Sequence, residues 1–125
     1  MIKRLVLLAL LLAAPVLDAQ ADFTGTWTGP FIMTMDGQER PDSAYAVLTQ
    51  KGAELTGTIG PSVDQQWPIL KGGKVDGASA SFDVQSDGPL VHFAIKLVDG
   101  RIKGDAAAEM DGRKFSAKLD LERKK

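Results

Sequence analysis

Five Asp-Gly dipeptides constrain the fold of this chain more than any other feature of its sequence. They occur at residues 36–37, 76–77, 87–88, 99–100 and 111–112, and the last four recur every 11 to 12 residues. Asp-Gly between apolar runs favours a type I′ turn, because both central residues of that turn need a positive φ angle. A repeat of one short strand and one tight turn predicts an antiparallel meander.

Alternation of apolar and polar residues predicts eight strands in this meander. In the first strand, Phe23, Trp27 and Phe31 share one face, and threonines occupy the other. The eight predicted ranges are residues 23–35, 43–50, 55–59, 67–75, 78–85, 90–97, 101–108 and 114–123. These ranges leave their longest loops at residues 36–42 and 60–66.

The turn positions also predict a pairing register. A two-residue turn at residues 99–100 places Phe93 opposite Ala106, and a turn at residues 111–112 places Ala106 opposite Ala117. Inward residues then face inward residues, as a buried face requires. The small residues of strand 101–108 lie between bulkier neighbours, a pattern that fills the interior of a small barrel.

The strand over residues 67–75 breaks the alternation. A regular hairpin would point Lys71 inward, whereas a bulge at Gly72-Gly73 would reverse the parity and bury Leu70. We favour the bulge, because paired glycines in a strand often mark one and an unpaired buried lysine is costly. Both alternatives stay open at this stage.

Eight short antiparallel strands with one apolar face form either a barrel or a sandwich. Strictly sequential strands favour the barrel, so we expect an all-β, eight-stranded, antiparallel up-and-down barrel. The outward face is rich in Thr, Lys and Asp. This polar face argues against an outer-membrane barrel, whose outside must be apolar.

Residues 1–21 predict a helical signal peptide. Lys3 and Arg4 provide a positive start, residues 5–14 form a short apolar run, and Ala19-Gln20-Ala21 resembles an A-x-A cleavage site. The apolar run is short for a membrane span, so an uncleaved anchor is the less favoured alternative. We expect a secreted or periplasmic protein whose single domain covers residues 22–125, a monomer without stable membrane insertion after cleavage.

Several classes of function find no support in the residues. The formal net charge of −1 argues against a nucleic-acid partner, which needs a basic surface. His92 is the only histidine, lies on the outward parity of its strand, and has no cysteine in the chain to join it in a zinc site. We therefore expect no catalytic residue, no metal and no cofactor, and we do not expect an enzyme.

The start of the predicted domain, Phe23-Thr24-Gly25-Thr26-Trp27, resembles the first-strand G-x-W motif of the lipocalin/calycin superfamily. This resemblance implies that Trp27 packs under a basic residue of the last strand, here Arg123, and closes one end of the barrel. The segment also looks like the avidin branch and like small exported bacterial barrels of unknown function that begin FTGTW. Thr28 departs from the asparagine of the avidin branch, so biotin binding is not implied.

Any binding site is expected at the end of the barrel opposite Trp27 and Arg123. The connections at residues 36–42, 60–66, 86–89 and 109–113 meet there, and loops on a rigid scaffold commonly carry function. Inward residues next to them would form an apolar mouth, with polar contacts at its rim. The predicted apolar residues are Met35, Ile59, Trp67, Val84, Val91 and Phe115, and the predicted rim residues are Arg40, Gln65 and Gln66.

Two functions fit this arrangement. In the first, the protein binds or carries a small apolar molecule at the open end of the barrel. In the second, side chains fill the barrel, and the protein is a protein-interaction module in the manner of calycin-type protease inhibitors. Small molecules that co-purify with the protein would favour the first function, and a filled barrel with no enclosed cavity would favour the second.

Overall fold

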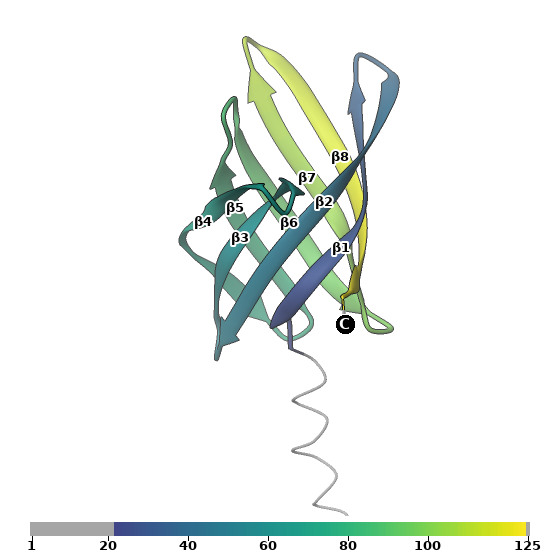
Figure 1. The fold of residues 1–125 in the computed structure, drawn as a ribbon. Coiled ribbons are helices and arrows are strands. Elements are labelled where there is room, and N and C mark those ends of the chain that lie inside the picture. The colour runs from purple at the N-terminus through teal and green to yellow at the C-terminus, as the bar shows by residue number, and fades with distance from the viewer. Residues whose placement is uncertain (1–21, 125) are drawn as a thin grey trace, which may run out of the picture.

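The computed structural model describes residues 22–124, which form a closed barrel of eight antiparallel strands (Figure 1). Each strand pairs with the next one in the chain, and β8 closes the ring by pairing with β1. The strands are β1 (Gly25–Met35), β2 (Gln38–Lys51), β3 (Glu54–Ser62), β4 (Gln65–Asp76), β5 (Ser79–Gln85), β6 (Leu90–Val98), β7 (Arg101–Met110) and β8 (Arg113–Arg123). The predicted up-and-down barrel is confirmed. The predicted signal peptide lies outside the described residues.

Three of the five Asp-Gly pairs form the predicted type of turn. Asp36-Gly37, Asp99-Gly100 and Asp111-Gly112 have positive φ at both residues, for example 51° and 79° at Asp99 and Gly100. The turn after β4 is shifted by one residue, to Gly77 and Ala78. Asp87-Gly88 lies in a longer connection, residues 86–89. The predicted pairs Phe93–Ala106 and Ala106–Ala117 both occur in the register.

The long loop predicted at residues 36–42 is wrong. The turn at Asp36-Gly37 starts β2 directly at Gln38, and Met35 pairs with Gln38. This segment contains Pro41, which cannot donate a ladder hydrogen bond. Proline is tolerated here because this part of β2 has no partner on its other side: the pairing of β2 with β3 begins only at Tyr45.

The expected loops at residues 60–66 and 109–113 are also mostly strand. β3 continues to Ser62, β4 begins at Gln65, and only residues 63 and 64 form the turn. In the same way, β7 reaches Met110 and β8 begins at Arg113. The longest connection between strands of the described barrel is therefore residues 86–89.

Strand β4 contains a bulge beside the paired glycines, as the favoured alternative predicted, but this bulge does not reverse the parity. Leu70 pairs with Asp83 and Lys74 with Ser81, so β4 has two more residues than β5 across this interval. Lys71 and Gly72 take up the excess at positive φ, 51° and 65°. Because the excess is an even number, the side chains before and after the bulge keep the same alternation between the inner and outer faces. Both expected burials are therefore wrong: Lys71 and Leu70 are exposed, and Ile69 and Gly73 are buried.

The barrel interior differs between its two ends. Of the six largest fully buried side chains, five belong to the end where the chain termini lie: Trp27, Phe23, Leu55, Ile102 and Leu121. The sixth, Val84, belongs to the other half. Above the first five, the stacked rings of Phe82 and Phe93 lie 4.9 Å apart, and Phe31 lies 6.4 Å from Phe93. This aromatic layer separates a packed half of the barrel from the half beneath the β1–β2 and β7–β8 hairpins.

Trp27 and Arg123 meet at the packed end. The register places them opposite each other on β1 and β8, and the Arg123 guanidinium carbon lies 4.3 Å from the Trp27 ring centroid. The indole N–H donates to the Phe23 carbonyl oxygen at 2.8 Å, and Arg123 donates to the carbonyl oxygens of Asp22 and Thr24. The contact therefore ties the entering segment to the last strand of the barrel.

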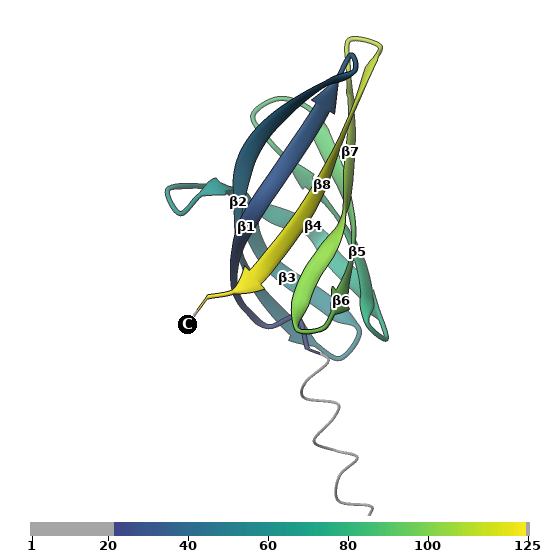
Figure 2. The same cartoon turned by 90° about the vertical axis from the view of Figure 1, so that its right-hand side faces the viewer.

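The wall of the barrel is uneven at the other end. The β1–β2 and β7–β8 hairpins stand highest, whereas the shorter β3–β4 hairpin bends away from the barrel (Figures 1 and 2). Its departure leaves residues 38–44 of β2 without a strand neighbour on that side. The result is an open end with a lateral notch beside β2. In residues 22–124 there is no helix that is long and apolar enough to cross a membrane.

Candidate functional site

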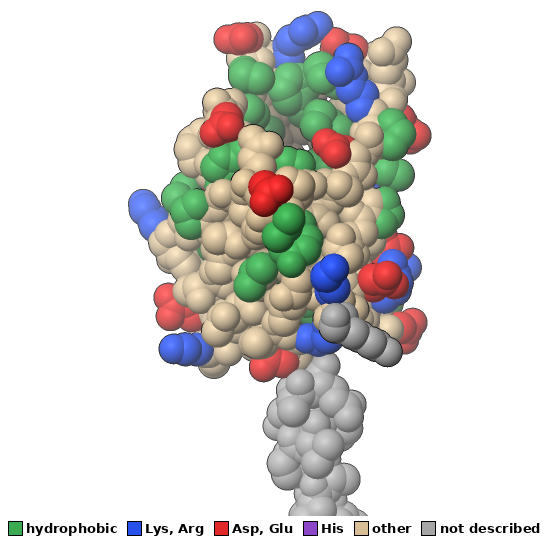
Figure 3. Space-filling view, viewed as in Figure 1, with side chains coloured by type: hydrophobic (Ala, Val, Ile, Leu, Met, Phe, Trp, Pro, Cys, Tyr) green, Lys and Arg blue, Asp and Glu red, His purple; other side chains and the backbone are tan. Residues whose placement is uncertain are grey.

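A cavity of about 560 Å³ occupies the open half of the barrel. It lies between the high hairpin tips, where Figure 3 shows hydrophobic side chains gathered around a hollow with charged side chains above them. Small-molecule sites in proteins usually measure roughly 300–1,000 Å³ and are lined mostly by apolar side chains. The cavity therefore has the size and the lining of a ligand site.

Small side chains and the aromatic layer explain why this half is hollow. Ala44, Ala106, Ala108 and Ala117 line the cavity from β2, β7 and β8, and they leave space that larger residues would fill. Phe31 and Phe93 line it from below. The same alternation of large and small residues that packs one end of the barrel thus leaves a void at the other.

The structure brings the six predicted apolar site residues together around this cavity. They come from six different strands and face a common space. These residues are Met35, Ile59, Trp67, Val84, Val91 and Phe115.

The Trp67 ring is held in place by the neighbouring loop. Its Nε1–H donates to Asp87 Oδ1 at 3.1 Å, and Gln65 Nε2 donates to Asp87 Oδ2 at 3.3 Å. Asp87 thereby connects the β3–β4 hairpin to the β5–β6 loop. Gln65, predicted as a rim residue, therefore acts in the structure as part of this bridge.

The other two predicted rim residues do not line the cavity. Gln66 accepts a hydrogen bond from the Thr58 hydroxyl at 2.6 Å and donates to the Val63 carbonyl oxygen at 3.0 Å, so it braces the β3–β4 hairpin. Arg40 is exposed on β2, opposite Met33.

A second bridge joins two neighbouring hairpin tips at the rim of the mouth. Arg113 Nη2 lies 2.7 Å from Asp36 Oδ2, which joins the β7–β8 tip to the β1–β2 tip. Both side chains are about 60% exposed, so this ion pair contributes little to stability. The ion pair links the tips of the β1–β2 and β7–β8 hairpins, as Asp87 links the β3–β4 hairpin to the β5–β6 loop.

Sequence analysis missed several residues of the cavity, of which Asp42 is the most informative. Phe31, Met33 and Met110 were omitted although their strands were recognised. Asp42 was assigned to a loop, whereas it belongs to β2, two residues before buried Ala44. Extending the alternation of Leu48, Ala46 and Ala44 backwards would have placed Asp42 on the inward face.

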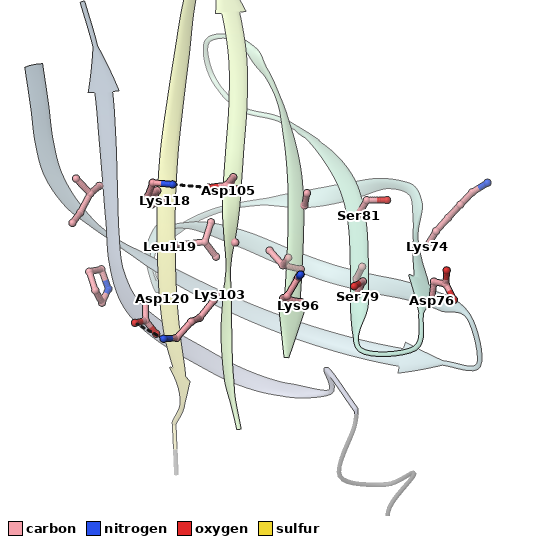
Figure 4. Close-up of a pocket in the computed structure, with 16 residues that line it drawn as sticks. Lys74, Asp76, Ser79, Ser81, Lys96, Lys103, Asp105, Lys118, Leu119 and Asp120 are labelled. Carbon is pink, nitrogen blue, oxygen red and sulfur yellow. Dashed lines mark hydrogen bonds and ion pairs between the residues drawn. The ribbon is translucent and has the colours of Figure 1, made fainter. Parts of the chain in front are cut away.

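A second hollow lies on the outer face of strands β4 to β8 (Figure 4). Lysines and aspartates surround it, and several of them pair: Lys118 lies 3.4 Å from Asp105, and Lys103 lies 3.9 Å from Asp120. Beside it, Arg101 contacts Asp120 at 2.7 Å, and this hydrogen bond raises the pKa of the guanidinium above its usual value. The charges of this hollow are largely compensated, so the internal cavity is the better candidate site.

His92 lies on the outer face, as its parity predicts. Its side chain is 60% exposed, and its Nδ1 lies 2.7 Å from Asp83 Oδ1 on β5. Neither residue belongs to the cavity lining. Across residues 22–124, no group of three or more His, Cys, Asp or Glu side chains is arranged to hold a metal ion.

Comparison with known proteins adds one structural likeness. No protein-family model matches the chain, and no curated protein matches it. Among solved structures, the chain is similar to a mutant of the fluorescent protein UnaG, with a TM-score of 0.46 and 14% sequence identity over 82% of this chain and 96% of that one. The assignment of the fold rests on the strand pairing of the chain itself, a closed eight-stranded antiparallel barrel.

Proposed function

We propose that this protein binds a small apolar molecule in the cavity at the open end of its barrel. The observation that carries the proposal is an apolar cavity of about 560 Å³, bounded by Trp67, Phe93 and Phe115. Transfer of an apolar ligand into such a space is favourable in proportion to the apolar area that leaves water. A side-chain-filled barrel, the premise of the interaction-module alternative, does not fit this half of the molecule.

The residues around the cavity support binding and not catalysis. Its charged lining side chains are Asp42, Asp111 and Arg113, and Arg113 pairs with Asp36. None of them forms a nucleophile with an adjacent base, the arrangement that covalent catalysis requires. We therefore propose a binder or carrier, not an enzyme. The barrel topology and the contact of Trp27 with Arg123 also support a distant relation to the lipocalin/calycin group.

Binding of Nile red, a neutral apolar dye, tests the proposal. We expect saturable binding with one site per chain, and a change in Trp67 emission as the dye enters, because Trp67 lines the cavity. Trp27 is fully buried at the other end of the barrel and should not respond. Dye fluorescence and intrinsic tryptophan emission measure the two effects in one titration.

A Trp67→Phe variant is the matched control, since it keeps an apolar ring at the same position. It should retain dye binding and lose the change in tryptophan emission. If dye binding is not saturable, or if the emission change persists without Trp67, the ligand does not occupy this cavity and the proposal is wrong.

We also propose that the protein is exported and begins at Asp22 after cleavage. The support is the pattern of residues 1–21: two basic residues, an apolar run and Ala19-Gln20-Ala21. N-terminal sequencing of protein collected outside the cytoplasm should read Asp22 first. Recovery of the chain in a membrane fraction with Met1 intact would contradict export with cleavage.

A further inference from the structure

We infer that the cavity is selective for an apolar ligand that carries a positive charge, such as a long-chain amine, with Asp42 as its counter-ion. The inference rests on the proposed binding function and specifies its ligand class. It is carried by three observations: a carboxylate at the exposed edge of an apolar cavity, an acidic mouth, and aromatic rings that line the same cavity.

Asp42 faces the cavity from β2. The register places it opposite Phe31, another residue of the cavity lining, and two residues before Ala44, which is buried. Within residues 22–124, no lysine, arginine or histidine nitrogen lies within 4 Å of its carboxylate. Asp42 is exposed at the edge of the cavity, so its carboxylate is hydrated in the free protein and accessible to a ligand.

One oxygen of Asp42 has a structural task. Its Oδ1 accepts the backbone N–H of Ser43 at 2.8 Å, at the stretch of β2 that lacks a partner strand. A carboxylate has about four acceptor positions, so this bond leaves Oδ2 able to accept from a ligand. An ammonium group would fit, because it offers up to three N–H donors and a full opposite charge.

The mouth around the cavity has an acidic excess. On the hairpins and loop at this end, acidic residues outnumber basic ones. The acidic residues are Asp36, Glu39, Asp42, Asp64, Asp87, Glu109 and Asp111, and the basic residues are Arg40, Arg113 and Lys114. A concave site edged by one sign of charge raises the local concentration of oppositely charged ligands.

The two arginines at this end do not favour an anionic ligand instead. Arg113 lines the cavity, but its guanidinium is engaged with Asp36 at 2.7 Å. Arg40 is exposed and lies outside the cavity lining. The aromatic rings Phe31 and Trp67 face the same space as Asp42, and ring faces attract cations.

Three probes with the same twelve-carbon tail test the charge preference at pH 7: dodecylamine, dodecanol and dodecanoate, each below its micelle concentration. We expect dodecylamine to displace Nile red at about three- to tenfold lower concentration than dodecanol, the effect of one charge-assisted contact at a partly exposed site. Dodecanoate should be the weakest of the three. Raising the salt concentration to 0.5 M should narrow the difference between amine and alcohol, because salt screens the attraction.

Two matched variants assign the effect to one carboxylate. Asp42→Asn retains an Oδ1 acceptor for Ser43 N–H and removes the charge, so it should abolish the advantage of the amine while dodecanol binding stays unchanged. Asp111→Asn removes a charge from the β7–β8 turn, where asparagine tolerates the positive φ of 54°. This variant should retain most of the advantage.

The outcomes separate the two proposals. If Nile red does not bind, the proposed function and the charge preference are both wrong. If Nile red binds and the amine is no better than the alcohol, or if dodecanoate binds best, only the charge preference is wrong. If Asp111→Asn removes the preference and Asp42→Asn does not, Asp42 is not the counter-ion.

Discussion

Replacing Trp27 by alanine is expected to lower the free energy of unfolding by about 3–5 kcal/mol, the usual cost of truncating a fully buried tryptophan. The indole has no exposed surface, donates to the Phe23 carbonyl oxygen and lies under Arg123. Its removal leaves a void at the packed end of the barrel. It also removes the ring that contacts both Phe23 of the entering segment and Arg123 of β8. Urea unfolding followed by circular dichroism measures the change.

Trp67→Ala is the matched control for this prediction. Trp67 is half-buried at the cavity and its indole N–H bonds to exposed Asp87, so the expected loss is smaller, about 1–2 kcal/mol. Equal unfolding midpoints for Trp27→Ala and the parent protein would contradict the role of Trp27 in closing the barrel.

Replacing Ala108 by tryptophan is expected to weaken Nile red binding more than about tenfold, a change of about 1.4 kcal/mol or more. Ala108 lines the cavity between Val91 and Phe115, and an indole there would occupy the space that the ligand needs. Because the side chain would enter a void, the free energy of unfolding should change by less than about 1.5 kcal/mol. Dye titration and urea unfolding of the same sample measure both quantities.

The control for this variant is Ala94→Trp, which adds the same side chain at an exposed position on the outer face of β6. It should bind Nile red like the parent protein. Unchanged binding in Ala108→Trp would mean that the dye lies elsewhere, and a loss of binding accompanied by unfolding would be seen in the urea curve.

Local chemistry was sufficient to predict the barrel because turns and parity are local properties. Asp99-Gly100 and Asp111-Gly112 adopt the positive φ angles that their residue types favour, and these two turns set the register of β6, β7 and β8. The period of two in strand side chains then places Phe93, Ala106 and Ala117 on one face. The six predicted apolar residues of the cavity followed from the same parity, together with the rule that alternate connections of an up-and-down barrel lie at the same end.

The predictions were wrong where the pairing with neighbouring strands decides the backbone conformation. Residues 38–42 have the composition of a loop, yet they are strand because β1 pairs with them, and Pro41 is tolerated because β3 bends away. The paired glycines predicted a bulge in β4, but its size of two residues, which preserves the parity, follows only from the pairing of β4 with β3 and β5.

The sequence by itself determined the number of strands, their order, three of the Asp-Gly turns and, outside the bulge of β4, the face that the strand side chains take, since these depend on residues close together in the chain. Only the tertiary structure decided that one half of the barrel is packed and the other hollow, and that Asp42 faces the hollow half. A cavity is the difference between the volume enclosed by eight strands and the volume of the side chains that enter it. That difference depends on the bend of β3 and β4 and on contacts between distant residues, so it exists only once the barrel has closed.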